Sequence, residues 1–277
     1  MIIEKRSSNA GHSNPGRYER TMNGYTSNSC VDFHNTADEI QAVDPTLAIL
    51  PVGSVEQHGP HLPVMTDWAV AAALGQRVAS ACGGFLLPAL PISTCREHMG
   101  KKGSVWMEPT TFYRMMRDII LSLKTQGFKK VAILQCHGGI FAMTPLVRDL
   151  NAQYNPELMV AHIDICNIFP LLYREGIVET NTELHAGEIE TSLMLALAPE
   201  AVHMERATDC VPAIPRSYLS YGSIFRASPS GVWGEPSKAT AQKGEQILAR
   251  ATQLIEEELN SAFSYMESKE KFNYSNF

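Results

Sequence analysis

Apolar runs of strand length alternate with helix-like segments along this chain. The runs lie at residues 46–53, 83–93, 129–139 and 157–165. Segments with apolar residues at helical spacing lie at residues 67–82, 109–127, 144–154 and 186–199. Strands separated by helices of this length predict an α/β fold, with a mostly parallel central sheet and helices on both of its faces.

The beginning of the chain differs from the rest, because residues 1–40 are polar and rich in Asn and Ser. They predict an N-terminal arm or extension. The chain has 277 residues and a hydrophobic content of 44%, enough for one large domain with a substantial core. No linker rich in Pro, Gly and Ser divides the middle of the chain. We therefore expect a single α/β domain over residues 41–277, with a two-domain division as the alternative.

Composition narrows the function classes. The formal net charge is -6, without a cluster of Lys and Arg, which argues against a nucleic-acid partner. No apolar run approaches the roughly 20 residues that cross a bilayer, so no membrane association is expected. The N-terminus lacks the apolar core of a signal peptide, which favours a cytoplasmic protein. The nucleophile motif of serine hydrolases and the glycine-rich motifs of nucleotide-binding proteins are both missing from the sequence.

The six cysteines form no C-x-x-C pair, so they read as reduced thiols and as small residues of the core. A zinc site built on cysteine is therefore not expected. Cys136, beside His137, could act as a nucleophile, but it fits better as the last buried residue of a strand.

Carboxylates and imidazoles gather where two of the predicted strands end. Glu56 and His58 follow the first apolar run, and His137 follows the third. Asp67 lies just inside the first long helix. In a parallel sheet, ligands gather at the carboxyl ends of the strands. A set of carboxylates and imidazoles without thiolates suits Zn²⁺, Mn²⁺ or Fe²⁺, so a metal site is predicted at this edge. The alternative for each residue taken alone is a polar loop or a helix cap.

A further cluster, His185, Glu188 and Glu190, stands at the entrance of the helix predicted over 186–199. Residues two apart on a helix point about 200° apart, so only one of the two glutamates can face a shared site.

Four segments in this order resemble the creatininase (creatinine amidohydrolase) family. They are "GSVEQHGPHLPVMTD", "CHGG", "HAGEIETS" and "GVWGEPSKATAQKGE". The resemblance extends from about residue 49 to residue 247. It implies a three-layer α/β/α fold with a dinuclear metal centre that hydrolyses amide or related C–N bonds in small polar, often cyclic, molecules. It also implies a homo-oligomer, with a hexamer as a frequent form.

The resemblance assigns roles to individual residues. Glu56 and His137 would bind one metal, His58 and Glu190 the other, and Asp67 would bridge the two. His185 would transfer protons beside the metals rather than bind them, so His185 and Glu190 are the expected catalytic residues. The expected cofactors are two divalent metal ions per chain, Zn, Mn or Fe, and the expected partner is a small-molecule substrate.

Two departures from the family pattern make creatinine itself a poor candidate substrate. Ile140 stands where family members usually carry Asn, and Gly139 stands where true creatininases carry Glu. Two other functions stay open. One is a hydrolase of a keto or lactone substrate derived from a sugar or cyclitol. The other is a metal-stabilised scaffold without turnover.

Three further residues are candidates for roles around the site, and two of them have two interpretations each. His61 either orients a metal ligand or is a structural histidine after a turn. His98 would reach the substrate from a loop. Trp233 either forms a pocket wall or is simply buried, in a loop followed by a helix that Ser237 caps.

Overall fold

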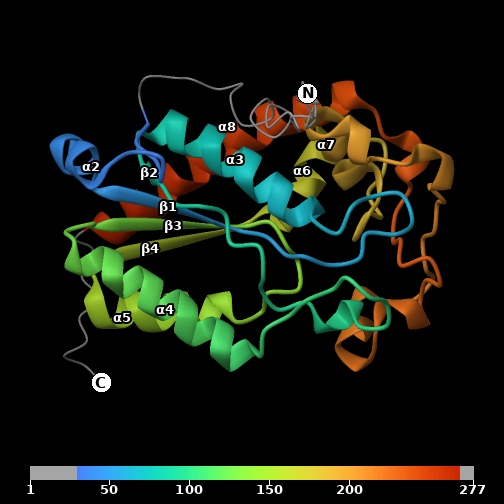
Figure 1. The fold of residues 1–277 in the computed structure, drawn as a ribbon, viewed down its shortest axis with the longest axis horizontal. Helices are drawn as coiled ribbons and strands as arrows, with labels where there is room; N and C mark the ends of the chain where they lie inside the picture. The colour runs from blue at the N-terminus through green and yellow to red at the C-terminus, as the bar shows by residue number, and fades with distance from the viewer. Residues whose placement is uncertain (1–29, 269–277) are drawn as a thin grey trace, which may run out of the picture.

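The computed structural model describes residues 30–268 and contains a sheet of four parallel strands in the order β2-β1-β3-β4 (Figure 1). The strands are β1 Leu47–Val52, β2 Phe85–Leu86, β3 Lys130–Gln135 and β4 Met159–Asp164. The predicted parallel sheet is confirmed. The second strand is much shorter than the apolar run 83–93 suggested. Pro88 and Pro91 lie directly beyond it, and proline cannot donate to a ladder.

Helices cover both faces of the sheet, which confirms the predicted three-layer arrangement (Figure 1). One face carries α3 Thr66–Cys82, α7 Glu188–Leu197 and α8 Ala241–Glu267, and the other carries α4 Pro109–Thr125 and α5 Met143–Tyr154. Because successive strand residues point to opposite faces, each strand serves both cores. Ile49 packs with α3 and α8, whereas its neighbours Ala48 and Leu50 pack with α4 and α5.

Two short helices complete the described elements of regular α-helix, α2 Ala37–Val43 and α6 Phe169–Arg174. Residues 1–29 of the expected arm lie outside the described residues. Within residues 30–40, the backbone N–H of Leu86 donates to the carbonyl of Val31, and α2 begins at a capping box between Thr36 and Glu39. The division into an arm and a domain stays a prediction.

The start of α8 differs from the expectation. Thr240 caps this helix by accepting a hydrogen bond from the backbone N–H of Lys243. The predicted cap, Ser237, instead lies in a 3-10 turn, Pro236–Lys238, and donates to the carboxylate of Asp209. The turn separates Ser237 from the helix, so the prediction was wrong by three positions.

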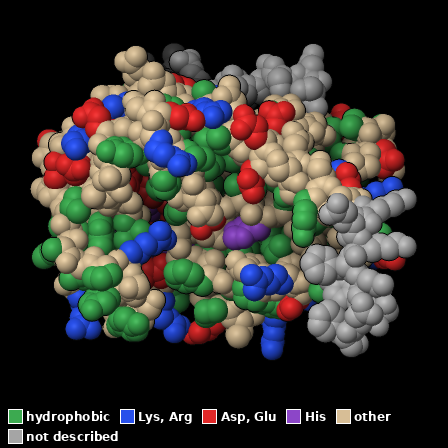
Figure 2. Space-filling model, turned by 180° about the vertical axis from the view of Figure 1, so that it is seen from behind, with side chains coloured by type: hydrophobic (Ala, Val, Ile, Leu, Met, Phe, Trp, Pro, Cys, Tyr) green, Lys and Arg blue, Asp and Glu red, His purple; other side chains and the backbone are tan. Residues whose placement is uncertain are grey.

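Acidic and basic side chains are interspersed over the described part of the face shown in Figure 2. This distribution agrees with the modest net charge of -6. Among residues 30–268, no helix is both long enough and apolar enough to cross a membrane.

Candidate metal centre

The segment after β1 lies directly against the first turn of α3, and Gly53 makes this approach possible. A Cβ built on Gly53 would lie 2.6 Å from the carbonyl carbon of Asp67. Because Gly53 has no side chain, the segment after β1 can pass close to α3, and Glu56 and His58 come to lie beside Asp67. All three side chains are almost fully buried, with exposed fractions of 0%, 0% and 2%.

A first cluster joins Glu56, Asp67 and His137. The Nδ1 atom of His137 lies 3.1 Å from Glu56 Oε2 and 3.2 Å from Asp67 Oδ2. One ligand-type atom from each of the three residues lies within 4.8 Å of the others. These are the residues expected to bind the first metal.

A second cluster joins His58, Asp67 and Glu190. The Nε2 atom of His58 lies 3.0 Å from Asp67 Oδ1 and 3.6 Å from Glu190 Oε2. Its ligand-type atoms also lie within 4.8 Å of one another. Asp67 therefore contributes one carboxylate oxygen to each cluster, as a bridging ligand would.

The hydrogen bonds of the two histidines leave one ring nitrogen of each facing the carboxylates. His137 Nε2 lies 2.9 Å from the carbonyl oxygen of Thr94, and His58 Nδ1 lies 3.1 Å from that of Glu56. A ring N–H donated to each carbonyl fixes the tautomer in which the opposite nitrogen is free to bind a metal.

Three carboxylate oxygens of the clusters lack a hydrogen bond, which is a property expected of metal ligands. Both oxygens of Glu56 and Oδ2 of Asp67 are buried without a well-aligned hydrogen bond from any described residue. Buried carboxylates without compensation are costly. A divalent cation bound by oxygen and imidazole ligands would supply that compensation, so the residues present fit the metal centre.

The charges of the clusters shift the pKa values of their members. Burial disfavours a charged His58, yet Asp67 and Glu190 outweigh it and raise its pKa to about 10. Burial likewise opposes charge on His137, but Glu56 and Asp67 hold its pKa well above the usual range. Burial raises the pKa of Glu190 to about 7, against the opposing effect of His58. Without metal, protons therefore occupy the imidazoles of His58 and His137 at neutral pH.

The two glutamates of α7 point to different surroundings. Glu190 faces His58, whereas the carboxylate of Glu188 accepts hydrogen bonds from the backbone N–H groups of Glu179 and Thr180 and pairs with Lys243 of α8. Glu188 lies in none of the three groups that could hold a metal among the described residues. The geometry therefore favours Glu190, as the family resemblance implied.

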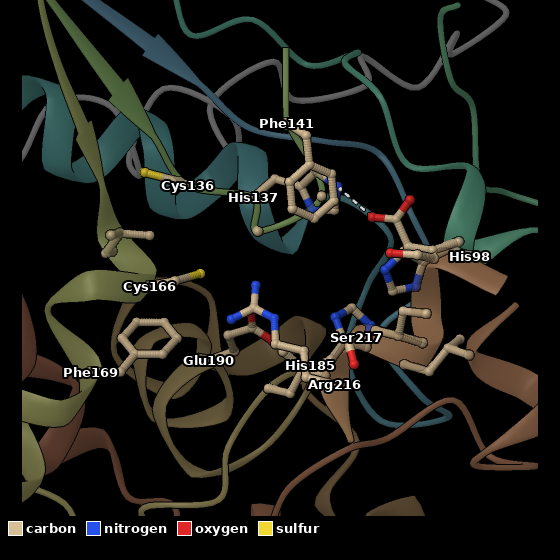
Figure 3. Close-up of a pocket in the computed structure, with 18 residues that line it drawn as sticks. His98, Cys136, His137, Phe141, Cys166, Phe169, His185, Glu190, Arg216 and Ser217 are labelled. Atoms are coloured by element: carbon tan, nitrogen blue, oxygen red, sulfur yellow. Dashed lines mark ion pairs between the residues drawn. The ribbon is translucent and has the colours of Figure 1, made fainter. Parts of the chain in front are cut away.

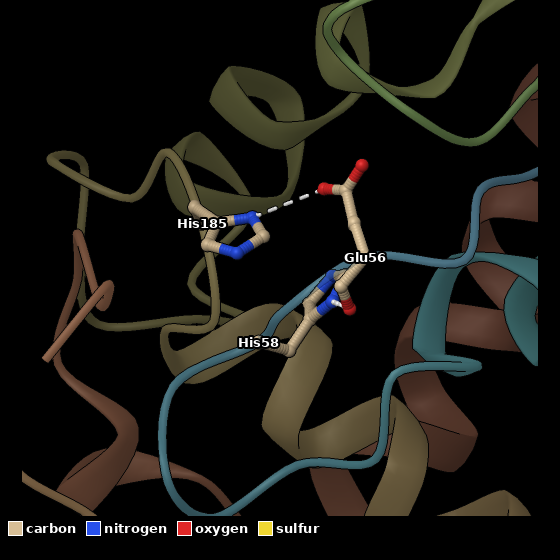
Figure 4. Close-up of side chains that lie close together, drawn as sticks. All are labelled: Glu56, His58 and His185. Carbon is tan, nitrogen blue, oxygen red and sulfur yellow. Dashed lines mark hydrogen bonds and ion pairs between the residues drawn. The ribbon is translucent and has the colours of Figure 1, made fainter. Parts of the chain in front are cut away.

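His185 enters the site from a segment distant in sequence from Glu56 and His58 (Figure 4). Its Nδ1 lies 3.7 Å from Glu56 Oε1, and its Nε2 lies 2.7 Å from the carbonyl oxygen of Gln57. A pair of backbone hydrogen bonds with Trp233 holds it there. Trp233 is only 5% exposed and does not line the cavity, so of its two interpretations the buried one is correct.

His98, which was expected to reach the substrate from a loop, lies in the 3-10 segment Arg96–His98 and lines the cavity, with an exposed fraction of only 3%. Its Nε2 lies 3.1 Å from Glu56 Oε1, and the side-chain amide of Gln57 lies 2.9 Å from its Nδ1. Sequence reasoning did not predict Gln57, although it lies between two expected ligands.

Two more residues were missed. Glu97 lies with its Oε1 3.4 Å from His137 Nε2. Glu183 accepts hydrogen bonds from the first backbone N–H groups of α7, those of Ile189 and Glu190, and burial raises its pKa to about 8. Each stands within two residues of a histidine of the site, His98 or His185, and this proximity was the only signal in the sequence.

The remaining predicted residues serve the structure. His61 is fully buried and lies 2.9 Å from the hydroxyl of Thr191, beside Glu190 on α7, so it supports this helix. Burial raises the pKa of the Cys136 thiol well above its usual range, which leaves it a protonated, unreactive residue after β3. Ile140 is 3% exposed and packs in the core beneath α4 and α5.

A cavity of about 360 Å³ opens beside the clusters (Figure 3). His98, His137, His185 and Glu190 contribute to its lining, and the opposite walls are largely apolar. A small molecule in this cavity would lie against the candidate metal ligands.

Proteins of known function resemble this chain along most of its length. A "Mycofactocin precursor peptide peptidase" of Mycobacterium ulcerans is 28% identical over 78% of this chain and 84% of its own length. A "3-dehydro-scyllo-inosose hydrolase" of Thermotoga maritima is 28% identical over 72% of each chain. A solved structure described as "Creatininase Mn" is 25% identical, with a TM-score of 0.71 over 86% of this chain and all of its own.

The family match covers the sheet, the helices on both faces and every residue of the two clusters. Residues 34–259 match the family model described as "Creatininase: Creatinine amidohydrolase". The chain therefore belongs to the creatininase family and is an enzyme of this group of metal-dependent amidohydrolases.

Proposed function

We propose that this protein is a hydrolase with a dinuclear metal centre, which cleaves an amide or related C–N bond in a small polar, in some cases cyclic, molecule. The observation that carries the proposal is the shared position of Asp67 between two clusters of ligand-type atoms. Glu56 and His137 would complete one ion's ligands, and His58 and Glu190 those of the other. The ions would be Zn, Mn or Fe.

The bound ions and His185 would have separate roles in the reaction. When bound, divalent ions in such a site lower the pKa of a water and polarise a carbonyl. Burial, together with His58, holds the pKa of His185 well below its usual range. A neutral His185 can take up a proton and give it to the leaving nitrogen, as general acid–base catalysis requires. Its place on the cavity wall supports this role.

The metal content of Asp67→Ala tests the bridge. We expect about two divalent ions per chain in the unaltered protein and loss of both in the variant, because one carboxylate serves each ion. Elemental analysis after gel filtration measures this. Asp164→Ala is the matched control, because Asp164 is a half-buried aspartate at the carboxyl end of β4 but belongs to none of the candidate metal groups. Full metal retention by Asp67→Ala would remove Asp67 from the bridge.

A second candidate function is the hydrolysis of a keto or lactone substrate derived from a cyclitol or sugar. The similarity to the inosose hydrolase supports it, because the same carbonyl chemistry would serve both bonds. A screen of cyclic amides, formamides, peptides and sugar lactones separates the two. Metal binding without turnover of any of them would favour a scaffold. The cytoplasmic location and the homo-oligomer, in its frequent form a hexamer, stay predictions.

A further inference from the structure

Arg216 brings a positive charge into the cavity from a distant part of the chain. It begins the 3-10 segment Arg216–Tyr221, and its side chain points into the cavity between Cys166, Phe169 and His185 (Figure 3). A Cβ built on Gly138 would lie 3.0 Å from Arg216 Nη2. The guanidinium therefore lies beside the residue that follows the candidate ligand His137.

The charge of Arg216 is not neutralised within the described structure. Across residues 30–268, its guanidinium forms no ion pair with a carboxylate. The two acidic residues that line the same cavity have other neighbours, since Glu97 faces His137 and Glu190 faces His58. An unpaired arginine in a cavity is available to a ligand.

Apolar side chains make up part of the wall around Arg216, beside the histidines and glutamates of the site. Phe141, Ile165, Phe169, Leu219 and Ile224 line the cavity. A second cavity of about 430 Å³ is also lined by Arg216 and by Phe169, Pro170 and Leu184. Arg216 is itself exposed to solvent, so an anion can reach its guanidinium directly.

We propose that Arg216 binds a carboxylate of the substrate, which makes the substrate an amide with a free carboxylate and an apolar portion. The inference rests on the proposed metal-dependent function. A guanidinium pairs with a carboxylate through two parallel hydrogen bonds. One guanidinium balances one monoanion, whereas a phosphate dianion needs further donors.

Metal-binding probes test the proposal without knowledge of the substrate. Succinic and glutaric monohydroxamic acids carry a metal-chelating hydroxamate and a carboxylate, and their carboxamide analogues lack the charge. Calorimetric titration of the Mn²⁺-loaded protein should show the acids binding about tenfold or more tightly than the amides, the usual contribution of a charged hydrogen bond. Arg216→Gln should abolish this preference and leave amide binding unchanged, and Arg216→Lys should keep part of it.

Arg206→Gln is the matched control, because Arg206 is exposed, pairs with Glu205 and lines neither cavity. It should bind all four probes like the unaltered protein. Equal binding of acids and amides, or a preference that survives Arg216→Gln, would overturn the proposal for Arg216 alone. Tighter binding of a phosphonate analogue would overturn the choice of carboxylate. If the protein takes up no Mn²⁺, the proposed function fails first.

Discussion

His137 is followed by two glycines, and the structure gives each of them a reason. The missing side chain of Gly138 leaves room for Arg216, and that of Gly139 leaves room for the carboxylate of Glu97. A Cβ on Gly139 would collide with Glu97. Two loops far apart in sequence thus bring opposite charges to either side of the candidate ligand. Gly139 was noted as a departure from true creatininases, and here it permits an acidic residue from elsewhere in the chain.

His185→Ala tests a single residue's role. If His185 transfers protons, the variant should keep its metal and lose about 10²–10⁴ in kcat, the usual contribution of general acid–base catalysis. The measurements are elemental analysis and steady-state kinetics on the best substrate of the screen.

The metal count decides the alternative role. His185 lies with Glu56 and His58 in a third group whose ligand-type atoms are within 4.8 Å of one another. Loss of an ion in His185→Ala would therefore make it a ligand and contradict the proposed proton transfer. His61→Ala serves as a comparison, because His61 is a buried histidine that supports α7 from outside these groups.

At the scale of elements, α7 carries one glutamate toward the candidate ligands and another into packing contacts. Glu190 points from one side of the helix toward β1 and its following segment. Glu188 points from the other side and ties the helix to Lys243 of α8 and to the loop before it. The helices α7 and α8 also approach each other closely here. A Cβ on Gly244 of α8 would collide with the backbone of Ser192 of α7.

Substitution of the two glutamates should therefore have different effects on metal binding and on stability. Glu190→Gln should bind one ion less and lose turnover. When both proteins are metal-free, its melting temperature should be close to that of the unaltered protein. Glu188→Gln should keep both ions but lose about 1–3 kcal/mol of unfolding free energy, because a buried charged partner is removed from Lys243 and two backbone donors. Elemental analysis and denaturant unfolding of the metal-free proteins measure the two effects. The reverse ranking would assign the metal to Glu188.

At the scale of the whole molecule, the site depends on the parallel sheet. The carboxyl ends of β1 and β3 lie side by side, so the segments after them carry Glu56, His58 and His137 to one edge. The helices α3 and α7 add Asp67 and Glu190 from the same end. The resulting cluster concentrates three carboxylates and two imidazoles, and in the absence of metal its charge balance is kept by protons.

Metal binding should consequently release protons and strengthen as the pH rises. His58, with a pKa of about 10, and His137, with a pKa well above its usual range, are both protonated at pH 7 without metal. An ion must displace a proton from each nitrogen that it binds. The dissociation constant should fall roughly tenfold per pH unit for each proton released between pH 6 and 8.

Calorimetry in buffers of different ionisation enthalpy counts these protons directly. We expect about one or more released per ion at pH 7. A pH-independent affinity, with no proton release, would show that the imidazoles are neutral before the metal arrives.

The sequence by itself determined the alternation of the main strands and helices and most of the candidate ligands. Periodicity predicts α/β alternation because a strand and a helix each repeat their apolar residues at their own spacing. The motifs around Glu56, Asp67 and His137 can be recognised from the sequence, because their spacing is local and does not depend on contacts with distant parts of the chain.

Only the tertiary structure decided which distant side chains join the site. Glu97 and Arg216 stand in short 3-10 segments that no periodicity describes, and their place depends on loop paths and on glycines that leave room for them. The choice between Glu188 and Glu190 likewise required the rotation of α7 about its own axis. That rotation is set by packing against α3 and α8, two helices that are distant from α7 in the sequence.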